Sequence, residues 1–215
     1  MNLLAFELST TSGSLAVFRD GQLASEIQWT EQPRQHQMLF DSVEKILKDC
    51  DLTPADVELY AVGRGPGNYT GLRMSIAAAQ AMALPGGNRV HCVDSGVALA
   101  RSFKPGSRTA VLGDARRGLL WVGLVDAAGS LAANWELVPA ENLSDWLEQH
   151  GGVDQLISPD HARLAEQIPA LGLGSVWHDA PVVPNATQIA KLASEQIASG
   201  VASLPEVPLY LQPPV

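Results

Sequence analysis

The chain has 215 residues, enough for one large domain or two small ones, each with a hydrophobic core. Hydrophobic residues make up 46% of it, and no apolar run approaches the roughly 20 residues of a membrane-spanning helix, so we expect no such helix. The formal net charge is −9 with 14 Lys and Arg residues. This disfavours tight nucleic-acid binding by the chain alone, because such affinity depends largely on neutralising phosphates.

The cysteines and the first residues indicate the compartment. Cys50 and Cys92 form neither a CxxC pair nor a disulfide framework. Residues 1–7 lack the basic start of a signal peptide and include the acidic Glu7. We therefore expect a reduced, cytoplasmic protein.

The basic residues are unevenly spread along the chain. They form either one locally basic face or separate solvated charges, and the second arrangement is the commoner one. Six of the 14 lie between residues 89 and 117: Arg89, Arg101, Lys104, Arg108, Arg116 and Arg117.

The first half of the chain alternates strands and helices. Asp20-Gly21 is a hairpin signal, and apolar positions after residue 35 recur at helical spacing with charges opposite. Thr53-Pro54 begins a short helix, with threonine as the cap and proline in the first turn. The predicted strands are 3–8, 15–18, 22–29, 58–63 and 89–94, and the predicted helices are 35–50, 72–84 and 95–103.

A second set of strands and three helix candidates follow. Gly13 and Gly118 hold the same place in two similar meanders, which indicates an internal duplication. The predicted strands are 109–113, 119–125 and 130–138, and the helix candidates are 141–150, a helix opened by Ser158-Pro159, and 185–199. We expect a two-lobed α/β protein, with 1–103 plus 185–215 in the N-terminal lobe and 104–184 in the C-terminal lobe.

A glycine-rich loop, Gly65-Pro-Gly-Asn-Tyr-Thr-Gly-Leu-Arg73, lies between a predicted strand and a predicted helix. This order can bind an anion, and Thr70 can cap the helix. The loop is not a P-loop, because no Gly-Lys-Ser/Thr follows, and Gly71 comes one residue late for a dinucleotide fingerprint. Asp94 nevertheless ends the next strand, about where a ribose-binding acid would lie. A phosphate site, a dinucleotide site and a tight turn that lets the helix pack closely all remain open.

The helix after this loop is apolar almost all round. Arg73, Ser75 and Gln80 are nearly its only polar members, so the helix must be covered on more than one side. Its small residues allow close helix packing, and its methionines suit an adaptable contact surface. The second covered side faces either another subunit or the chain's own core.

The sequence shows no clear catalytic or metal-binding pattern. The five histidines include no pair at i,i+3 or i,i+4, and no Cys or carboxylate cluster surrounds them. No Gly-x-Ser-x-Gly nucleophile motif is present. The hydroxyls at 9–12 could grip a phosphate, although such hydroxyls belong to turns more often. We predict no catalytic residue, no metal and no cofactor.

The loop at 65–73 resembles the GPGS[FY]TGLR signature of the bacterial TsaB (YeaZ) family. Residues 5–11 resemble the family's opening strand, and Gln35-His36 with the amphipathic helix that follows resembles its first helix. The segments 93–100, 114–117 and 208–211 also fit. The likeness covers most of the chain, and the loop motif is highly specific.

This resemblance implies an actin-like ATPase fold, that of sugar kinases and Hsp70, with two duplicated lobes. It also implies a non-catalytic role in making threonylcarbamoyladenosine on tRNA. The family's partner TsaD (Gcp) carries the metal, the nucleotide and the transfer step, ATP-binding TsaE joins the pair, and tRNA is met only indirectly. In TsaD two histidines at i,i+4 hold a metal, whereas this chain offers only His36 on that helix.

The resemblance also implies where partners bind. The family uses its first two helices to form a homodimer or, in its place, the heterodimer with TsaD. The implied interface consists of His36, Leu39, Val43, Arg73, Met74, Ala77, Ala78, Ala81 and Met82. The family-signature loop consists of Gly65, Pro66, Gly67, Asn68, Tyr69, Thr70 and Gly71.

One residue departs from the family pattern. Glu7 stands where the family usually has Asp, the acid that helps to organise the metal and nucleotide in actin-like ATPases. The extra methylene displaces the carboxylate by roughly a bond length, which a Mg²⁺ site tolerates poorly. The alternative hypothesis remains an autonomous actin-like ATPase or kinase that uses the loops at 9–12 and 65–71. A nicotinamide-dependent enzyme is a third.

Overall fold

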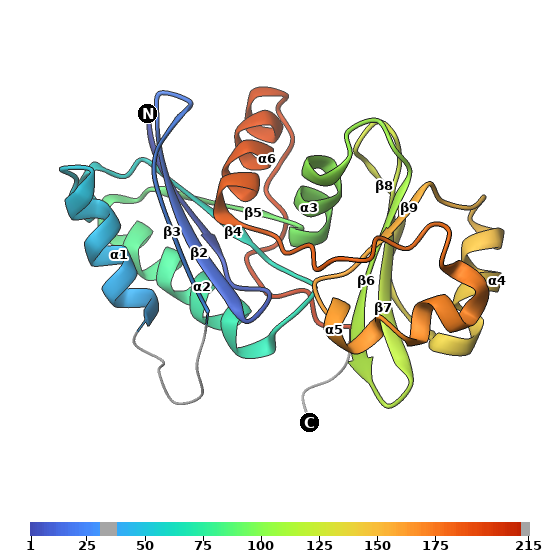
Figure 1. Ribbon diagram of the computed structural model, residues 1–215. Coiled ribbons are helices and arrows are strands. Elements are labelled where there is room, and N and C mark those ends of the chain that lie inside the picture. Colours follow the sequence, from blue (N-terminus) through green and yellow to red (C-terminus); the bar gives the residue numbers. More distant parts are fainter. Residues whose placement is uncertain (31–37, 212–215) are drawn as a thin grey trace. The chain divides into compact units, whose positions relative to one another are not determined.

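The computed structural model describes residues 1–30 and 38–211 (Figure 1). They form two compact units, the first from Met1–Ala98 with Pro184–Tyr210 and the second chiefly from Leu99–Val183. Each unit has a β-sheet of its own. The lobe boundaries expected from the sequence, 103/104 and 184/185, stay a prediction.

The first unit contains a five-stranded mixed sheet with the order β3-β2-β1-β4-β5. An antiparallel meander is formed by β1 (Asn2–Glu7), β2 (Ser12–Arg19) and β3 (Gln22–Thr30). Two further strands, β4 (Leu59–Gly63) and β5 (Arg89–Val93), run parallel to β1. Because these three strands are parallel, their carboxyl ends meet at one edge of the sheet, which is where ligands bind in many open α/β sheets.

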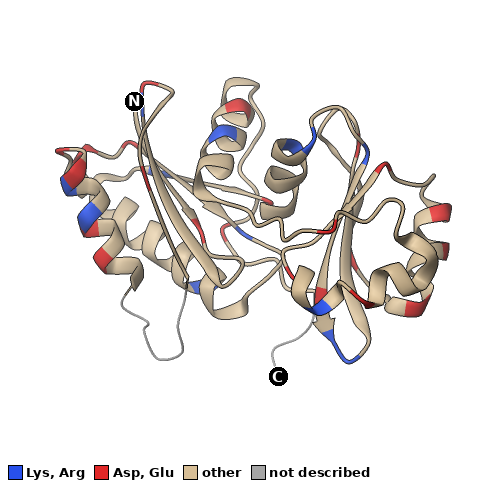
Figure 2. Ribbon diagram, in the orientation of Figure 1, with Lys and Arg blue, Asp and Glu red and all other residues tan. Residues whose placement is uncertain are grey.

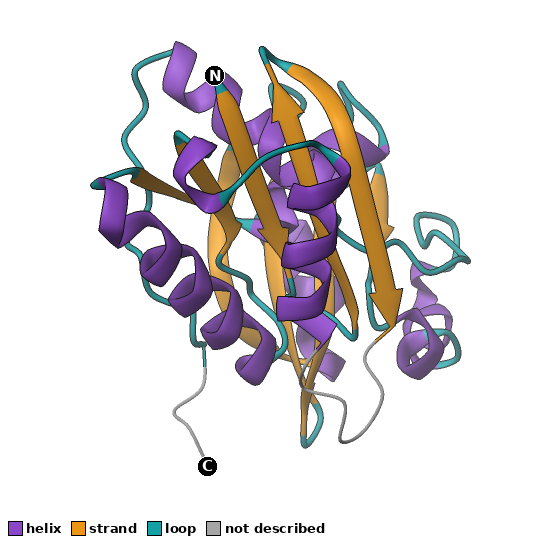
Figure 3. Ribbon diagram, turned by 90° about the vertical axis from the view of Figure 1, so that its left-hand side faces the viewer, coloured by secondary structure: helices purple, strands orange, loops and turns teal. Residues whose placement is uncertain are grey.

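Helices cover both faces of this sheet. The helices α1 (Met38–Asp49) and α2 (Tyr69–Ala83) pack on one face, and α6 (Ala186–Ala198) packs on the other (Figure 3). Single 3-10 turns lie at Pro54–Asp56 and Leu84–Gly86, and α3 (Ser95–Phe103) begins close after β5. The helix predicted over 35–50 is therefore present from Met38, and its expected first residues lie outside the described part of the chain.

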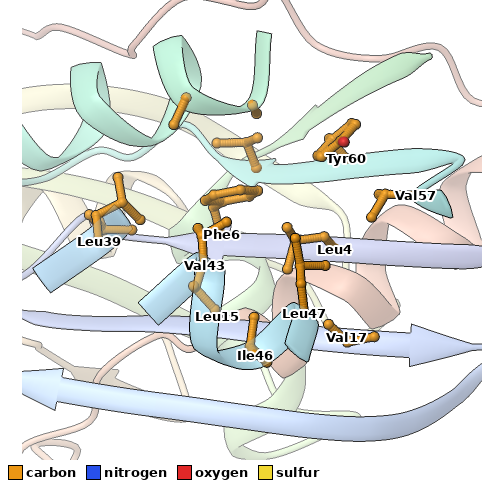
Figure 4. Close-up of a cluster of buried hydrophobic side chains, with 14 of the residues drawn as sticks. Leu4, Phe6, Leu15, Val17, Leu39, Val43, Ile46, Leu47, Val57 and Tyr60 are labelled. Carbon is orange, nitrogen blue, oxygen red and sulfur yellow. The ribbon is translucent and has the colours of Figure 1, made fainter. Parts of the chain in front are cut away.

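The apolar core between the sheet and the two helices follows from residue alternation. Side chains of a strand point alternately to opposite faces, so Leu4 and Phe6 of β1 and Leu15 and Val17 of β2 all point to the helix-covered face. Figure 4 shows the α1 side chains that meet them: Leu39, Val43, Ile46 and Leu47. Burying each such side chain contributes about 1.5–3 kcal/mol, so this contact holds α1 firmly to its own sheet.

The second unit repeats the first on a smaller scale. Its meander consists of β6 (Thr109–Arg116), β7 (Leu119–Val125) and β8 (Leu131–Pro139), and β9 (Gln155–Ile157) pairs in parallel with β6. The order β8-β7-β6-β9 matches β3-β2-β1-β4 of the first unit. The predicted duplication is therefore confirmed at the level of topology.

The helices of the second unit differ from the prediction in one place. The helix α4 (Leu143–Gln149) follows a 3-10 turn at Ala140–Asn142 and lies within the predicted 141–150. The helix expected after Ser158-Pro159 is reduced to α5 (His161–Leu164) and an irregular turn at Pro169–Leu173, where Gly172 leaves the helical region. No helix among the described residues is both long and apolar enough to cross a membrane.

Candidate functional site

The signature loop joins β4 to α2 and presses against the end of β1. The Asn68 N–H donates to the carbonyl oxygen of Ser9 over 2.6 Å. A Cβ atom at Gly67 would lie 2.0 Å from that same oxygen, and one at Gly71 would lie 2.1 Å from the carbonyl oxygen of Leu8. Real Cβ atoms do not approach an oxygen so closely, so both glycines are required by the contact between the two backbone segments.

The cap of α2 differs from the prediction. The helix begins at Tyr69 rather than at Leu72, and Asn68 caps it in place of Thr70. The side-chain oxygen of Asn68 accepts from the N–H groups of Thr70 (3.1 Å) and Gly71 (3.4 Å). Those two N–H groups, which an anion would need, are therefore already satisfied within the chain.

Glu7 lies at the carboxyl end of β1, beside Gly63 at the end of β4. Its side chain is fully buried, and its Oε1 accepts from the Ser9 N–H over 2.5 Å. Its Oε2 has no hydrogen-bond partner among the described residues, and a Cβ at Gly63 would lie 2.0 Å from it. Burial raises the pKa of the Glu7 carboxyl well above its ordinary value. The carboxyl thus fills the space beside a glycine and is turned away from solvent.

A test of this burial follows from its pH dependence. Because the pKa of Glu7 is raised on folding, the native state retains a proton that the unfolded chain loses above its ordinary pKa of 4.5. The free energy of unfolding should therefore fall as pH rises above that value, by about 1.4 kcal/mol for each pKa unit of the shift. Glu7→Gln keeps the shape without the ionisation, so its stability relative to the wild type should increase as pH rises above 4.5.

Urea denaturation at several pH values measures this effect. Glu44→Gln on the exposed side of α1 is the matched control, and it should follow the wild-type pH dependence. Parallel pH profiles for wild type and Glu7→Gln would show that the Glu7 carboxyl is not buried as described.

Arg64 holds the segment that follows α6 against the sheet of the first unit. The Arg64 Nε lies 3.3 Å from Asp94 Oδ1, and both side chains are largely buried. Its Nη1 donates to the carbonyl oxygen of Pro205, and its own carbonyl oxygen accepts from the Leu209 N–H. Leu204 also pairs with Cys92 on β5. We call residues 203–210 the C-terminal strap. It covers part of the free edge of β5, which would otherwise present unpaired peptide groups.

The strap continues along α2 and ends on an aromatic cluster. The Arg73 guanidinium carbon lies 4.0 Å from the centre of the Tyr69 ring and 5.5 Å from that of Tyr210. The Arg73 Nε donates to the Tyr210 hydroxyl over 2.6 Å, and the two rings stack at 4.7 Å. About two turns further along α2, Gln80 donates to the Glu206 carboxylate. No role for Tyr210 or Glu206 is predicted from the sequence, although 208–211 is one of the segments that resemble the family.

The structure divides the predicted interface residues into two groups. Leu39, Val43 and Ala78 are buried in the core of their own unit, and their place in an interface stays a prediction. The remaining α2 positions reach the surface: Arg73, Ala77 and Ala81 are exposed, and Met74 and Met82 are half-buried. His36 lies outside the described residues.

The outward side of α2 carries mostly short side chains. Exposed positions recur there every three or four residues, at Thr70, Arg73, Ala77 and Ala81 on α2 and at Leu84 just after it, and Leu84 is 81% exposed; Gln80 is exposed as well and contacts the C-terminal strap. We call Thr70, Arg73, Ala77, Ala81 and Leu84 the outer α2 strip. On α1, the large apolar residue at the surface is Phe40, which is 59% exposed. Small residues in such a strip permit close approach of another helix.

The described residues contain no group of three or more His, Cys, Asp or Glu side chains that could hold a metal ion. A family model described as "TsaD: tRNA N6-adenosine threonylcarbamoyltransferase" matches residues 30–204, more than half of the chain. The chain belongs to the TsaD family. Within it, the TsaB (YeaZ) resemblance predicted from the sequence is confirmed.

Two TsaB proteins are similar to this member of the TsaD family. It is 28% identical to the tRNA threonylcarbamoyladenosine biosynthesis protein TsaB of Bacillus subtilis, over 99% of this chain and 94% of that protein. It is 35% identical to TsaB of Escherichia coli over 85 residues, which are 39% of this chain and 36% of that protein.

Solved structures show the same relationship and the fold. YeaZ from Pseudomonas aeruginosa matches with a TM-score of 0.79 and 27% identity, over 98% of this chain and 99% of that one. The activator of 2-hydroxyisocaproyl-CoA dehydratase from Clostridium difficile matches with a TM-score of 0.56 at 12% identity, over 95% and 99%, and shares the fold alone. The predicted actin-like α/β fold of the TsaD family member is confirmed.

Proposed function

We propose that this chain is a non-catalytic scaffold and activating subunit of the complex that forms N6-threonylcarbamoyladenosine on tRNA. The observation that carries the proposal is the likeness to TsaB of Bacillus subtilis along 99% of the chain. In this proposal the chain binds TsaD and, with it, TsaE, works in the cytoplasm, and leaves the tRNA mainly to TsaD. The two described cysteines, both free and buried, suit a reducing compartment.

The outer α2 strip, together with Phe40 on α1, is the surface that we propose for TsaD. Its side chains are small or apolar, apart from Thr70 and the Arg73 that the two tyrosines hold in place. A surface of this kind suits a helix-to-helix contact, in which small residues let backbones approach and a central Arg–Tyr cluster supplies most of the energy. In the absence of TsaD, the same strip is proposed to join two copies of the chain.

The buried state of Glu7 supports the non-catalytic part of the proposal. An acid that organises Mg²⁺ must present an ionised carboxylate to the ion. Here the carboxyl lies buried beside Gly63, accepts from one backbone N–H and is desolvated, which disfavours ionisation. Asn68 satisfies the N–H groups at the start of α2. The loop is therefore better explained by close backbone packing than by phosphate binding.

Two assays on purified full-length protein test the proposal. In a mixture of TsaD, TsaE, tRNA and the threonylcarbamoyl precursors, formation of the modified adenosine should depend on adding this chain. In calorimetry, the isolated chain should neither bind nor turn over Mg·ATP. Modification without the chain would contradict the scaffold role, and turnover by the isolated chain would favour the alternative of an autonomous ATPase.

A further inference from the structure

The turn between β6 and β7 holds two arginines in a backbone conformation that arginine rarely adopts. The φ angles of Arg116, Arg117 and Gly118 are 71°, 53° and 76°. Among the described residues, the other non-glycine residues with positive φ are Asp20 and Asp51. Aspartate tolerates this left-handed region because its short side chain can hydrogen-bond locally, whereas arginine gains no such compensation.

The chain itself shows that the turn does not need arginine. The hairpin between β2 and β3 uses Asp20-Gly21, with φ angles of 50° and 80°, and Arg117-Gly118 has nearly the same pair, 53° and 76°. Both are two-residue turns in which Asp-Gly or Asn-Gly is the favoured choice. Arg117 therefore weakens its turn relative to an aspartate or asparagine. Backbone strain that persists at an exposed turn indicates that the side chain there has a function.

A third arginine lies beside the turn. Arg163 of α5 and Arg116 approach the same carboxylate: their Nη1 atoms lie 3.6 Å and 3.4 Å from Asp114 Oδ2. Arg163 also lies 3.6 Å from Asp160 Oδ1. The arginine side chains are 65% (Arg116) and 48% (Arg163) exposed, against 20% and 30% for Asp114 and Asp160. The carboxylates thus lie beneath the guanidinium groups, which face outward.

These three residues, Arg116, Arg117 and Arg163, form what we call the arginine cluster. Figure 2 shows basic positions together at the β6–β7 turn and on α5. The net charge of the whole chain is −9, so three neighbouring arginines contrast with its acidic average. The guanidinium groups of Arg116 and Arg163 have donors beyond those that their long ion pairs use, and the planar fork of a guanidinium matches phosphate oxygens.

We propose that the arginine cluster contacts the phosphate backbone of the tRNA. The proposal rests on the proposed function, because tRNA is the substrate named for the family. It goes beyond that function by giving this chain one direct RNA contact, which supplements the main hold of TsaD. The contact is independent of base sequence, since a turn that presents guanidinium groups to phosphates positions the RNA without reading it.

The variant Arg117→Asn separates the RNA contact from the fold. Asparagine suits the turn, so the midpoint of urea unfolding should stay equal or rise. Binding of an unmodified tRNA transcript is followed by fluorescence anisotropy between 50 and 200 mM salt, for the chain alone and for its complex with TsaD. Arg117→Asn should weaken binding several-fold, and the slope of log K against log salt should fall by about 0.7–0.9 for one lost phosphate contact.

The matched control is Arg89→Asn, which removes an equal charge from an exposed position on β5 of the first unit. It should leave affinity and slope unchanged. Equal slopes for wild type and Arg117→Asn, both alone and in the complex, would overturn the proposal. If the variant lost association with TsaD while its RNA affinity stayed unchanged, the proposal would also be overturned. The arginine cluster would then bind an acidic surface of a partner protein instead of RNA. Failure of the proposed function would instead show as no association of wild type with TsaD.

Discussion

Gly71→Ala is expected to lower the free energy of unfolding by about 2 kcal/mol or more. The new Cβ would lie 2.1 Å from the carbonyl oxygen of Leu8, which belongs to the backbone and cannot rotate away. Overpacking of this kind costs about 1–3 kcal/mol and occasionally more. Alanine is the better helix former by up to about 1 kcal/mol, and at this position in the first turn of α2 the steric cost is the larger effect.

The measurement is urea denaturation of wild type and variant. Gly174→Ala is the matched control, because its Cβ would meet nothing closer than 3.8 Å and its backbone is helical, with φ −58°. The control should stay within about 0.5 kcal/mol of wild type. If Gly71→Ala were equally stable, the signature loop would not press on β1 as described, and its glycines would need another explanation.

Ala81→Arg is expected to weaken association with TsaD by at least about 100-fold. Ala81 is exposed in the middle of the outer α2 strip, so arginine adds a long charged side chain where the proposal requires close helix contact. An unpaired charge buried at such a contact costs about 3 kcal/mol or more, and each 1.4 kcal/mol is about a factor of ten in affinity. Folding should be unaffected, because the side chain can extend into solvent in the free protein.

Co-purification with TsaD, followed by size-exclusion chromatography, measures this loss. Ala198→Arg, at an exposed position of α6 on the opposite face of the sheet, is the matched control and should retain the complex. Ala78→Arg would not serve, because Ala78 is 6% exposed and the charge would enter the chain's own core. An Ala81→Arg variant that still associates like wild type would exclude the outer α2 strip as the interface.

Much of the fold could be predicted because local signals and hydrophobic patterns agree. Asp20-Gly21 predicted the hairpin between β2 and β3, and the helical spacing of apolar residues after residue 35 predicted α1. The shortest elements could not be predicted from hydrophobic periodicity, because β9 has only three residues and α5 only four. Over such lengths neither strand nor helix periodicity can be distinguished from chance.

The interface residues were harder to predict than the fold. Ala77, Ala78 and Ala79 are chemically identical, yet Ala77 is exposed and the other two are buried, because the sheet decides which side of α2 it covers. The Arg73–Tyr210 hydrogen bond joins residues 137 positions apart. No spacing rule connects them, although an aromatic residue in a proline-rich closing segment was a signal that this segment packs on something. The cap moved to Asn68 because its side chain, unlike that of Thr70, precedes the N–H groups to be satisfied.

Calorimetric titration of TsaD with the full chain tests the central claim, that this protein is a partner of TsaD and has no ATPase activity of its own. The account predicts saturable binding that Glu7→Gln retains and Ala81→Arg loses, with the wild-type chain inert toward Mg·ATP before TsaD is added. Absence of binding by the wild type, in a sample that urea denaturation shows to be folded, would contradict the account.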